Sequence, residues 1–328
     1  MLEWILGLDG GGTKTILALA QKNGEVLGLF FGAGVNPFDQ PQWRNELEML
    51  LKKCPIKPSE IAFSSFGLPG YGESASINAQ QLEVVKNFAG KNSIALNDVA
   101  VAFAGALAGK PGVLILAGTG SMAWAGNGIS VTRVGGFGDG FGDEGSGYWI
   151  GQQALRKLSW ALDGRLEDTR YRDAMLEAIG ASDAEGLIAW FYGLEHQRSR
   201  VAALAQNVDQ LAEADNLTAI DILLEAANLL AAHGKTAWRK LELQSGASIS
   251  YAGSVFKSRT IRETVRHQLE DLGHWEAPTA PPIAGALIDA ATRANWTTDP
   301  NWNFTNWIER INTTLESKIS DLEPSQPL

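Results

Sequence analysis

The sequence predicts an α/β protein built from two related domains. The first observation is that one pattern occurs twice: a strand, a glycine/threonine loop, a second strand, an Asn-Gly turn and a third strand. The second is that strand-like and helix-like segments alternate early in the chain, whereas the later part is more helical. The third is that 328 residues with 45% hydrophobic content suffice for two cores. We therefore expect two domains that hold one nucleotide in a cleft between them, the second domain being larger and more helical.

The first copy of the pattern begins with an apolar strand over residues 4–8, which runs into Asp9-Gly10-Gly11-Gly12-Thr13-Lys14-Thr15 and a second strand over 16–20. Glycines let backbone N–H groups approach anionic oxygens, and a threonine hydroxyl adds a donor, so this loop is expected to bind phosphate. Asp9 stands at the strand end, where it would face a phosphate-bound magnesium ion through water. Taken alone, the segment also fits an ordinary glycine-rich hairpin.

The second copy places Gly118-Thr119-Gly120-Ser121 after a strand over 113–117 and before a strand over 122–125. Both copies continue to an Asn-Gly pair, the strongest short hairpin signal. A third strand follows in each, over 26–31 and 129–134. A Walker A motif and a dinucleotide fingerprint both require a helix after the loop, and a strand is expected here instead.

The remaining elements follow from hydrophobic spacing and turn residues. In the first part we expect helices over 42–53, 78–89 and 99–108 and strands over 61–66 and 93–96. In the second part we expect helices over 149–162, 171–179, 184–192 and 218–241 and a strand over 248–252. Thr218 and Asp221 form a plausible capping pair. A turn at 109–112 suggests domains of residues 1–112 and 113–302, with a final helix over about 303–320 joining the first domain.

The composition limits the partners and the chemistry. The net charge is −10 and no basic run is present, so neither a nucleic acid nor an anionic membrane is an expected partner. No signal sequence or membrane-spanning helix is expected either, which favours a cytoplasmic protein. The single cysteine, Cys54, excludes a disulfide or a complete cysteine-ligated metal site within one chain. The four histidines lie in the later half of the sequence, away from the glycine-rich loops, so no histidine-based site is expected.

The most unusual stretch covers residues 135–147, in which seven of thirteen residues are glycine. Ordering such a loop costs backbone entropy, so it needs a compensating reason unless it is a flexible linker. Its carboxylates could accept hydrogen bonds from the hydroxyl groups of a sugar; they are Asp139, Asp143 and Glu144.

Asp98 follows an expected strand, and the carboxyl ends of strands are where ligands bind in open α/β sheets. In phosphoryl transfer a positioned aspartate accepts the proton of the acceptor hydroxyl, while loops and magnesium stabilise the transferred group. Asp98 is therefore a candidate catalytic base. A helix N-cap ahead of Val99 is the alternative, and one residue can serve both purposes.

Taken together, six segments resemble the N-acetylglucosamine kinase and glucosamine kinase group of the BadF/BadG/BcrA/BcrD-type ATPase family, within the actin-like sugar kinase superfamily. They occur in the family's order and cover residues 9 to about 287. The segments are Asp9–Thr15, Asn97-Asp98, Gly118–Ser121, Gly142–Ser146, Ala252–Phe256 and Pro281–Leu287.

The resemblance implies two ribonuclease-H-like (actin-like ATPase) domains, ATP and Mg²⁺ as cofactors, an amino sugar as substrate, and a role in amino sugar metabolism. It implies that Asp98 is the base and that Asp9 serves the metal; we also expect a homodimer. Nucleotide-binding residues would be Gly11, Gly12, Thr13, Lys14, Gly118, Thr119, Gly120, Ser121, Gly253 and Ser254. Sugar-binding residues would be Asn36, Asp98, Gly136, Phe137 and Asp143.

The sequence departs from its relatives at Gly135-Gly136-Phe137-Gly138-Asp139, where many of them carry Gly-Gly-Trp-Gly-Pro. Asp139 would repel a lactyl carboxylate and favour a free amine, but the acceptor stays open among N-acetylglucosamine, glucosamine, N-acetylmuramic acid and other hexose derivatives. One alternative is an ATPase of the dehydratase- or reductase-activator type, which needs cluster-ligating cysteines that this chain lacks. Another is a non-catalytic sugar-sensing regulator; such proteins often lose the catalytic aspartate or a phosphate loop, and both are present here.

Overall fold

The structure is a computed structural model that describes residues 4–193, 195 and 197–320. It divides into two compact units. Unit 1 takes the chain up to Lys110 and the segment from Pro278 onward, and unit 2 runs from Pro111 to Ala277. The sequence assigned residues 278–302 to the second domain; the structure places them in unit 1, because the helix they contain packs on the strands of that unit.

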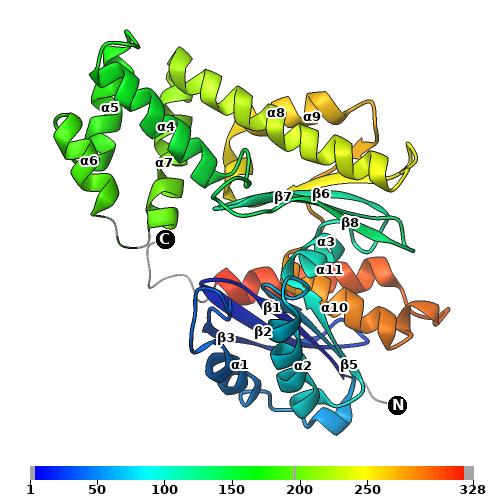
Figure 1. The fold of residues 1–328 in the computed structure, drawn as a ribbon. Helices are drawn as coiled ribbons and strands as arrows, with labels where there is room; N and C mark the ends of the chain where they lie inside the picture. Colours follow the sequence, from blue (N-terminus) through cyan, green and yellow to red (C-terminus); the bar gives the residue numbers. More distant parts are fainter. Residues whose placement is uncertain (1–3, 194, 196, 321–328) are drawn as a thin grey trace. The chain divides into compact units, whose positions relative to one another are not determined.

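Unit 1 is built on a five-stranded sheet with the order β3-β2-β1-β4-β5 (Figure 1). The strands are β1 (Trp4–Gly10), β2 (Lys14–Gln21), β3 (Val26–Ala33), β4 (Ile61–Leu68) and β5 (Ser93–Asn97). The first three pair antiparallel as a meander, and β4 and β5 run parallel to β1. The carboxyl ends of β1, β4 and β5 therefore meet at one edge of the sheet.

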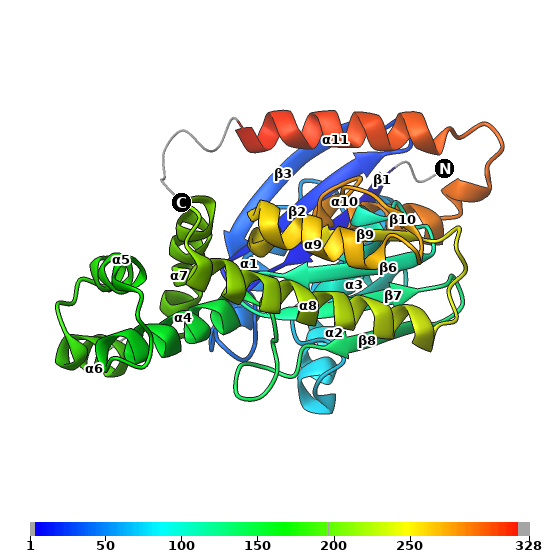
Figure 2. The ribbon, with the colours of Figure 1, turned by 90° about the horizontal axis from the view of Figure 1, so that it is seen from above.

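Helices cover both faces of this sheet, and the alternation of side chains along β1 shows why. Leu6 and Leu8 pack with α1 and α2, whereas Ile5 points to the opposite face and packs with α10 and α11. The helices are α1 (Trp43–Leu51), α2 (Ala75–Ala89), α3 (Asp98–Ala106), α10 (Pro282–Arg293) and α11 (Phe304–Ser320), with short 3₁₀ turns η1 (Pro58–Glu60) and η3 (Trp296–Thr298). Figure 2 shows α11 lying along the strands of the meander.

Unit 2 repeats this topology with the order β10-β9-β6-β7-β8. The strands are β6 (Gly112–Ala117), β7 (Ser121–Gly126), β8 (Val131–Gly135), β9 (Ser248–Ala252) and β10 (His274–Trp275). Strands β6 to β8 form an antiparallel meander, and β9 runs parallel to β6. The duplicated pattern in the sequence thus corresponds to two sheets with the same arrangement of meander and parallel strands.

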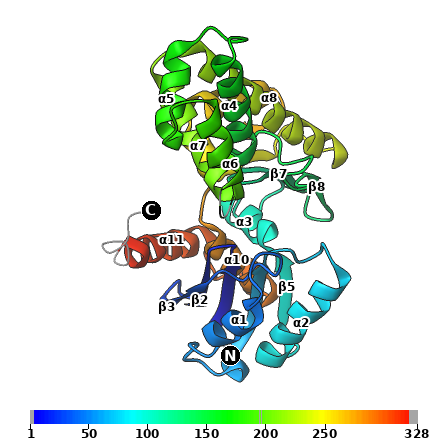
Figure 3. The same cartoon turned by 60° about the vertical axis from the view of Figure 1, so that its left-hand side comes forward.

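The helices of unit 2 form two groups. Helices α8 (Leu217–Lys240) and α9 (Arg259–Leu269) pack together beside the sheet, and a cluster of four further helices contacts α8 through α4 and α7 (Figure 3). The cluster consists of α4 (Gly147–Leu162), α5 (Thr169–Ile179), α6 (Ala184–Tyr192) and α7 (Gln197–Glu213); the turn η2 (Ser254–Lys257) follows β9. These helices make unit 2 more helical than unit 1.

Helix α8 has 24 residues and a mean hydropathy of 1.2, so by length and composition alone it could cross a membrane. No membrane-spanning helix was expected from the sequence. In the structure α8 packs on β6, β7 and β8, and residues such as Leu223, Leu230 and Ala231 are fully buried. The apolar composition of α8 is that of a core helix.

Three helices and one cap differ from the sequence expectations. Helices α7, α9 and α10 were not predicted, although each carries buried apolar residues at helical spacing. The expected capping pair of Thr218 and Asp221 is wrong: Asn216 caps α8 by accepting a hydrogen bond from the Ala219 amide at 3.0 Å. The Thr218 hydroxyl instead donates to Asp168 at 2.7 Å and ties α8 to the start of α5.

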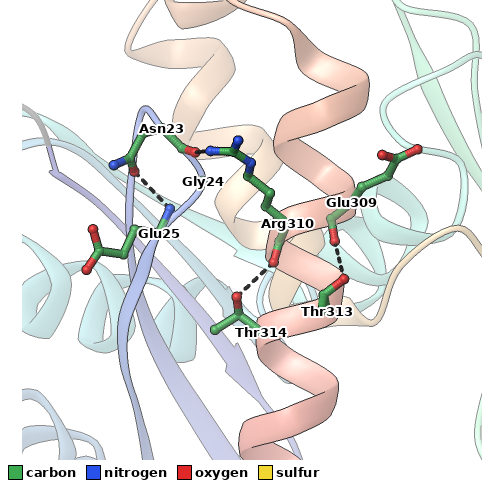
Figure 4. Close-up of a pocket in the computed structure, with 7 residues that line it drawn as sticks. All are labelled: Asn23, Gly24, Glu25, Glu309, Arg310, Thr313 and Thr314. Atoms are coloured by element: carbon green, nitrogen blue, oxygen red, sulfur yellow. Dashed lines mark hydrogen bonds between the residues drawn. The ribbon is translucent and has the colours of Figure 1, made fainter.

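A polar groove of about 550 Å³ lies in unit 1 between the β2–β3 turn and α11 (Figure 4). Arg310 donates to the carbonyl oxygen of Asn23 at 3.0 Å along this groove. The β2–β3 turn is at the opposite end of β2 from the glycine loop, and eight residues of strand span about 26 Å. The groove is therefore separate from the predicted phosphate site.

Candidate functional site

The candidate site of unit 1 forms where β1 and β5 end. Asp9 is the second-last residue of β1 and pairs with Gly67 of β4, whose next residue Leu68 pairs with Asn97 at the end of β5. One strand therefore separates Asp9 from Asp98, a spacing of about 10 Å between backbones. The two carboxylates predicted to serve the metal and the base thus share one edge of the sheet.

The first glycine loop is held tightly at its base and is open at its tip. The Gly11 amide donates to the Lys14 carbonyl at 3.0 Å, and the Val35 amide donates to the Gly11 carbonyl at 3.0 Å. A Cβ atom at Gly34 would lie 2.0 Å from the Gly12 carbonyl oxygen, so only glycine fits there. By contrast, no atom of the described residues lies within 4 Å of a Cβ built at Gly12. Gly12, Thr13 and Lys14 are exposed, which leaves the backbone accessible to a ligand.

Asp98 is the first residue of α3, and the cap of that helix is its neighbour Asn97. The Asn97 side chain accepts from the Val99 amide at 3.0 Å, and its amide group donates to the Tyr71 carbonyl at 2.8 Å. Asp98 Oδ1 also accepts from the Val99 amide, at 2.9 Å. From the sequence, Asp98 was a candidate for the N-cap of this helix. In the structure the N-cap is Asn97, and Asp98 is an additional acceptor at the helix start.

Both carboxyl groups have raised pKa values. Burial raises the pKa of Asp9 to about 7, with a further contribution from the charge of Asp98 and an opposing one from Lys14. Burial also raises the pKa of Asp98 to about 6; the Val99 amide opposes this shift, and the charge of Glu73 adds to it. Desolvated carboxylates near each other favour a proton or a cation, as expected of groups that bind metal or accept protons.

Asn36 lies directly after Gly34 and Val35, the segment that contacts the glycine loop. Its side-chain amide donates to Asp39, and its Oδ1 accepts from the Phe38 amide at 3.2 Å. These bonds form a local turn. The backbone next to Asn36 therefore contacts the glycine loop, whereas the Asn36 side chain forms its hydrogen bonds within its own turn.

The second loop closes the candidate site of unit 2. The Gly118 carbonyl accepts from the Gly147 amide at 2.8 Å, which joins the loop to the start of α4. A Cβ at Gly253 would lie 2.3 Å from the Ala117 carbonyl oxygen and 3.0 Å from the Gly118 amide nitrogen, so the start of η2 packs against the same loop. The space beside Gly118 itself is open: no described atom lies within 4 Å of its built Cβ. Gly253 therefore lies against loop 118–121, at the ends of β6 and β9, and the nucleotide-binding role of these residues stays a prediction.

Asp143 supports this loop from inside the unit. Its Oδ1 accepts from the Ser121 amide at 3.4 Å, and its Oδ2 lies 2.5 Å from Arg198 Nη2. The side chain of Asp143 is only 5% exposed. The Ser121 hydroxyl also donates to the Glu144 carbonyl at 2.7 Å. The structure thus gives Asp143 an internal ion pair in addition to the predicted sugar contact, which stays a prediction.

The other predicted sugar-reading residues lie at the start of the glycine-rich loop. Gly136 has φ of 71°, and a Cβ there would lie 2.7 Å from the Met122 side chain. Phe137 is 63% exposed, and the Arg133 guanidinium lies 5.6 Å from its ring centroid. Asp139 lies 3.8 Å from Arg198, so its charge is partly balanced. The repulsion of a lactyl carboxylate inferred from the sequence is weakened accordingly.

Two residues of this site were missed by sequence reasoning. Arg198 lies at the start of the unpredicted helix α7. His233 was taken to be remote from the glycine-rich loops; this is wrong, because its Nε2 lies 3.5 Å from Glu144 Oε2 and its ring contacts Gly135. Burial lowers the pKa of His233, while the charges of Glu144 and Asp143 oppose that shift. About ninety residues of sequence separate His233 from Glu144, so no local pattern could reveal that the two side chains meet.

Comparison with known proteins agrees with these observations. A sequence model of the BadF/BadG/BcrA/BcrD ATPase family matches residues 6–287. The chain belongs to this family. It is 29% identical over 254 residues to an N-acetylmuramic acid/N-acetylglucosamine kinase of Clostridium acetobutylicum, covering 74% of this chain and 82% of that protein. It is also 29% identical over 249 residues to an N-acetyl-D-glucosamine kinase of Dictyostelium discoideum, covering 70% and 77% of the two chains.

Solved structures with a similar fold confirm the fold class. A candidate N-acetylglucosamine kinase from Chromobacterium violaceum superposes with a TM-score of 0.68 at 24% identity, over 88% of this chain and 99% of that one. A glucokinase of the ROK family from Streptomyces griseus, solved with glucose and AMPPNP, superposes with a TM-score of 0.56 at 14% identity, over 89% and 99%. Two α/β units of the sugar kinase and actin-like ATPase type are therefore the architecture of this member of the family, as the sequence predicted.

Proposed function

We propose that the protein is an ATP-dependent kinase that phosphorylates an amino sugar, with N-acetylglucosamine or glucosamine as acceptor and the 6-hydroxyl as the position of transfer. The observation that carries the proposal is Asp98: a carboxylate with a raised pKa at a strand's carboxyl end, beside Asp9 and the open glycine loop. The kinase names of the curated relatives from Clostridium acetobutylicum and Dictyostelium discoideum support it.

The proposed reaction needs one proton acceptor. Asp98 accepts the proton of the sugar hydroxyl as its oxygen attacks the γ-phosphorus of ATP, and the bond from that phosphorus to the bridging oxygen breaks to release ADP. An aspartate with a pKa near 6 is ionised at neutral pH and still basic enough to share a proton in the transition state. The backbone N–H groups of loop 11–14 and loop 118–121 bind the phosphates.

Asp9 fits a role in holding Mg²⁺, because its partly buried carboxylate lies near a second carboxylate and a cation would relieve their repulsion. Mg²⁺ would supply positive charge to the phosphate oxygens, through water on the Asp9 side. Gly253 and Ser254 border the adenosine, and Asn36, Gly136, Phe137 and Asp143 contact the sugar. We also propose that the protein is cytoplasmic and forms a homodimer.

The alternatives are less well supported. An activator ATPase that holds an iron–sulfur cluster at a dimer interface needs two cysteine ligands from each subunit, and this chain has only Cys54, which is partly buried with its thiol donating to the Ile56 carbonyl at 3.3 Å. A non-catalytic sugar sensor would not need Asp98 together with both phosphate loops.

The test is a coupled ADP-release assay with N-acetylglucosamine, glucosamine, N-acetylmuramic acid and glucose, each with and without Mg²⁺. We expect turnover with at least one amino sugar, dependence on Mg²⁺, and little ADP release without sugar. Folded protein that binds ATP but phosphorylates none of these sugars would overturn the kinase assignment. Activity with N-acetylmuramic acid as well would show that the substrate range resembles the one in the name of the Clostridium acetobutylicum relative.

A further inference from the structure

His233 occupies an unusual place for a helix residue. It is 9% exposed, on the part of α8 that packs beneath the sheet of unit 2. A Cβ built at Gly135 would lie 3.0, 3.1 and 3.3 Å from three atoms of the His233 ring. Gly135 is the last residue of β8 and has φ of 74°, so the ring packs against the backbone at the point where the chain leaves the sheet and the glycine-rich loop begins.

The same ring faces the other end of that loop. His233 Nε2 lies 3.5 Å from Glu144 Oε2, at the outer limit of a hydrogen bond. Within the part of the chain that the structure describes, buried Glu144 Oε2 and buried His233 Nδ1 have no hydrogen-bond partner. A buried carboxylate oxygen without a donor is unfavourable, and His233 Nε2, 3.5 Å away, can supply one. A small inward movement of Glu144 would form the bond.

Glu144 is also connected to the second phosphate loop, because its carbonyl accepts from the Ser121 hydroxyl at 2.7 Å. Its neighbour Asp143 is fixed separately by Arg198 and by the Ser121 amide. The backbone of the loop's far end is thus anchored to residues 118–121, and its Glu144 side chain is left for His233.

We propose that His233 is a positioning residue that sets the sugar-reading side of loop 135–147, by packing against Gly135 and by hydrogen-bonding Glu144 when the loop closes on the amino sugar. The inference rests on the proposed function, because Gly136, Phe137 and Asp143 are sugar-binding residues only under that function. His233 touches neither sugar nor nucleotide. Its loss leaves the phosphate loops intact and makes the loop between Gly135 and Glu144 less ordered.

The variants distinguish the hydrogen bond from the packing. In His233→Gln the side-chain amide nitrogen reaches the position of Nε2 and can donate to Glu144, whereas in His233→Asn it reaches only the position of Nδ1. We expect His233→Asn to raise the KM for the amino sugar about tenfold, with the ATP KM within about twofold of wild type. His233→Gln should recover most of the sugar KM. Adding Glu144→Ala to His233→Asn should cost little more than the worse single change, since one bond is lost once.

An exposed pair on α9 provides the matched control. His267 Nδ1 lies 3.9 Å from Glu270 Oε1, and the His267 side chain is 83% exposed. His267→Asn should change neither KM. Thermal unfolding of each variant shows whether any change reflects loss of the fold.

Hydrogen exchange in the peptides that cover residues 135–147 gives a readout that does not depend on turnover. We expect faster exchange in His233→Asn than in wild type, His233→Gln or His267→Asn. If the wild type phosphorylates no amino sugar, the proposed function fails, and the exchange comparison still decides whether His233 orders the loop. Unchanged loop exchange in His233→Asn would overturn the inference. So would an equal rise in the sugar KM for His233→Asn and His233→Gln, or an unchanged sugar KM in an active His233→Asn variant.

Discussion

The charge of Asp98 acts on Asp9, adding to burial in raising the pKa of Asp9 to about 7. Asp9 is the second-last residue of β1 and Asp98 directly follows β5, and β4 alone lies between these two strands. Two desolvated carboxylates at one sheet edge are unfavourable for the ligand-free protein. Binding of a cation, or of a proton, would relieve this unfavourable charge.

The pH dependence of turnover should report on Asp98. A general base must be ionised, so kcat at saturating Mg²⁺, ATP and amino sugar should fall below a pKa of about 6 and level off above it. The charge of Glu73 raises the pKa of Asp98, so Glu73→Gln should move the acid limb to lower pH. Steady-state kcat between pH 5 and pH 8 for both proteins measures this. If kcat falls at the same pH in the two proteins, the group that titrates is not Asp98.

Stability should reveal the unfavourable charge of Asp9. The pKa of Asp9 is raised from 3.8 in an unfolded chain to about 7 in the fold, so stability is lost as pH rises through that range. Asp9→Asn should therefore raise the Tm of the ligand-free protein at pH 8, by at least about 2 °C, and leave it nearly unchanged at pH 4. Glu60→Gln, at an exposed position of the same unit, is the control. A lower Tm for Asp9→Asn at pH 8 would mean that the carboxylate stabilises the fold.

The open space beside two glycines should belong to the nucleotide. No described atom lies within 4 Å of a Cβ at Gly12, Gly118 or Gly246, and none of the three has the positive φ that strains other residues. Alanine at each should leave the Tm within about 2 °C of wild type, since no clash arises. Gly12→Ala and Gly118→Ala should weaken ATP binding at least about tenfold, because the methyl group keeps phosphate oxygens from the backbone. Gly246→Ala should bind ATP normally; calorimetric Kd values for the three decide the matter.

The Arg198–Asp143 ion pair should matter more than a surface pair of similar geometry. Arg198→Met leaves the carboxylate of Asp143 buried without its counter-charge, and we expect a loss of about 1–3 kcal/mol in unfolding free energy, since Arg198 itself is partly exposed. Arg165 and Asp163 form a 2.6 Å pair with side chains at least half exposed, so Arg165→Met should destabilise the protein less than Arg198→Met does. Urea unfolding compares the two. Equal losses would show that the burial of Asp143 has no energetic consequence.

The sequence was most informative where local rules act. Short apolar runs and Asn-Gly turns predicted both meanders, and the strand ends placed Asp9, Asp98 and residues 118–121 correctly on their elements. The family motif around residues 281–287 was noticed, but its helix was assigned to the wrong unit. The return of the chain to unit 1 before α10 depends on packing against β1 and β4, which no local pattern encodes.

The partners of the glycine-rich loop could not be predicted for the same reason. Arg198 lies 55 residues from Asp143, and His233 lies on a helix whose apolar stripe gave no hint of a polar contact. The sequence identified the loop as costly to order, and the structure shows which side chains lie against it. Burial, which raises the pKa values of Asp9 and Asp98, is likewise a property of the folded packing.

The central claim is that Asp98 is the catalytic base, and Asp98→Asn tests it most directly. The asparagine keeps size and hydrogen bonding at the start of α3, where Asn97 remains the cap, but it cannot accept the hydroxyl proton. We predict that kcat for the amino sugar falls at least about a hundredfold, while the Kd for ATP stays within about twofold and the circular dichroism spectrum is unchanged. Turnover within a few fold of wild type would contradict the account and place the base elsewhere.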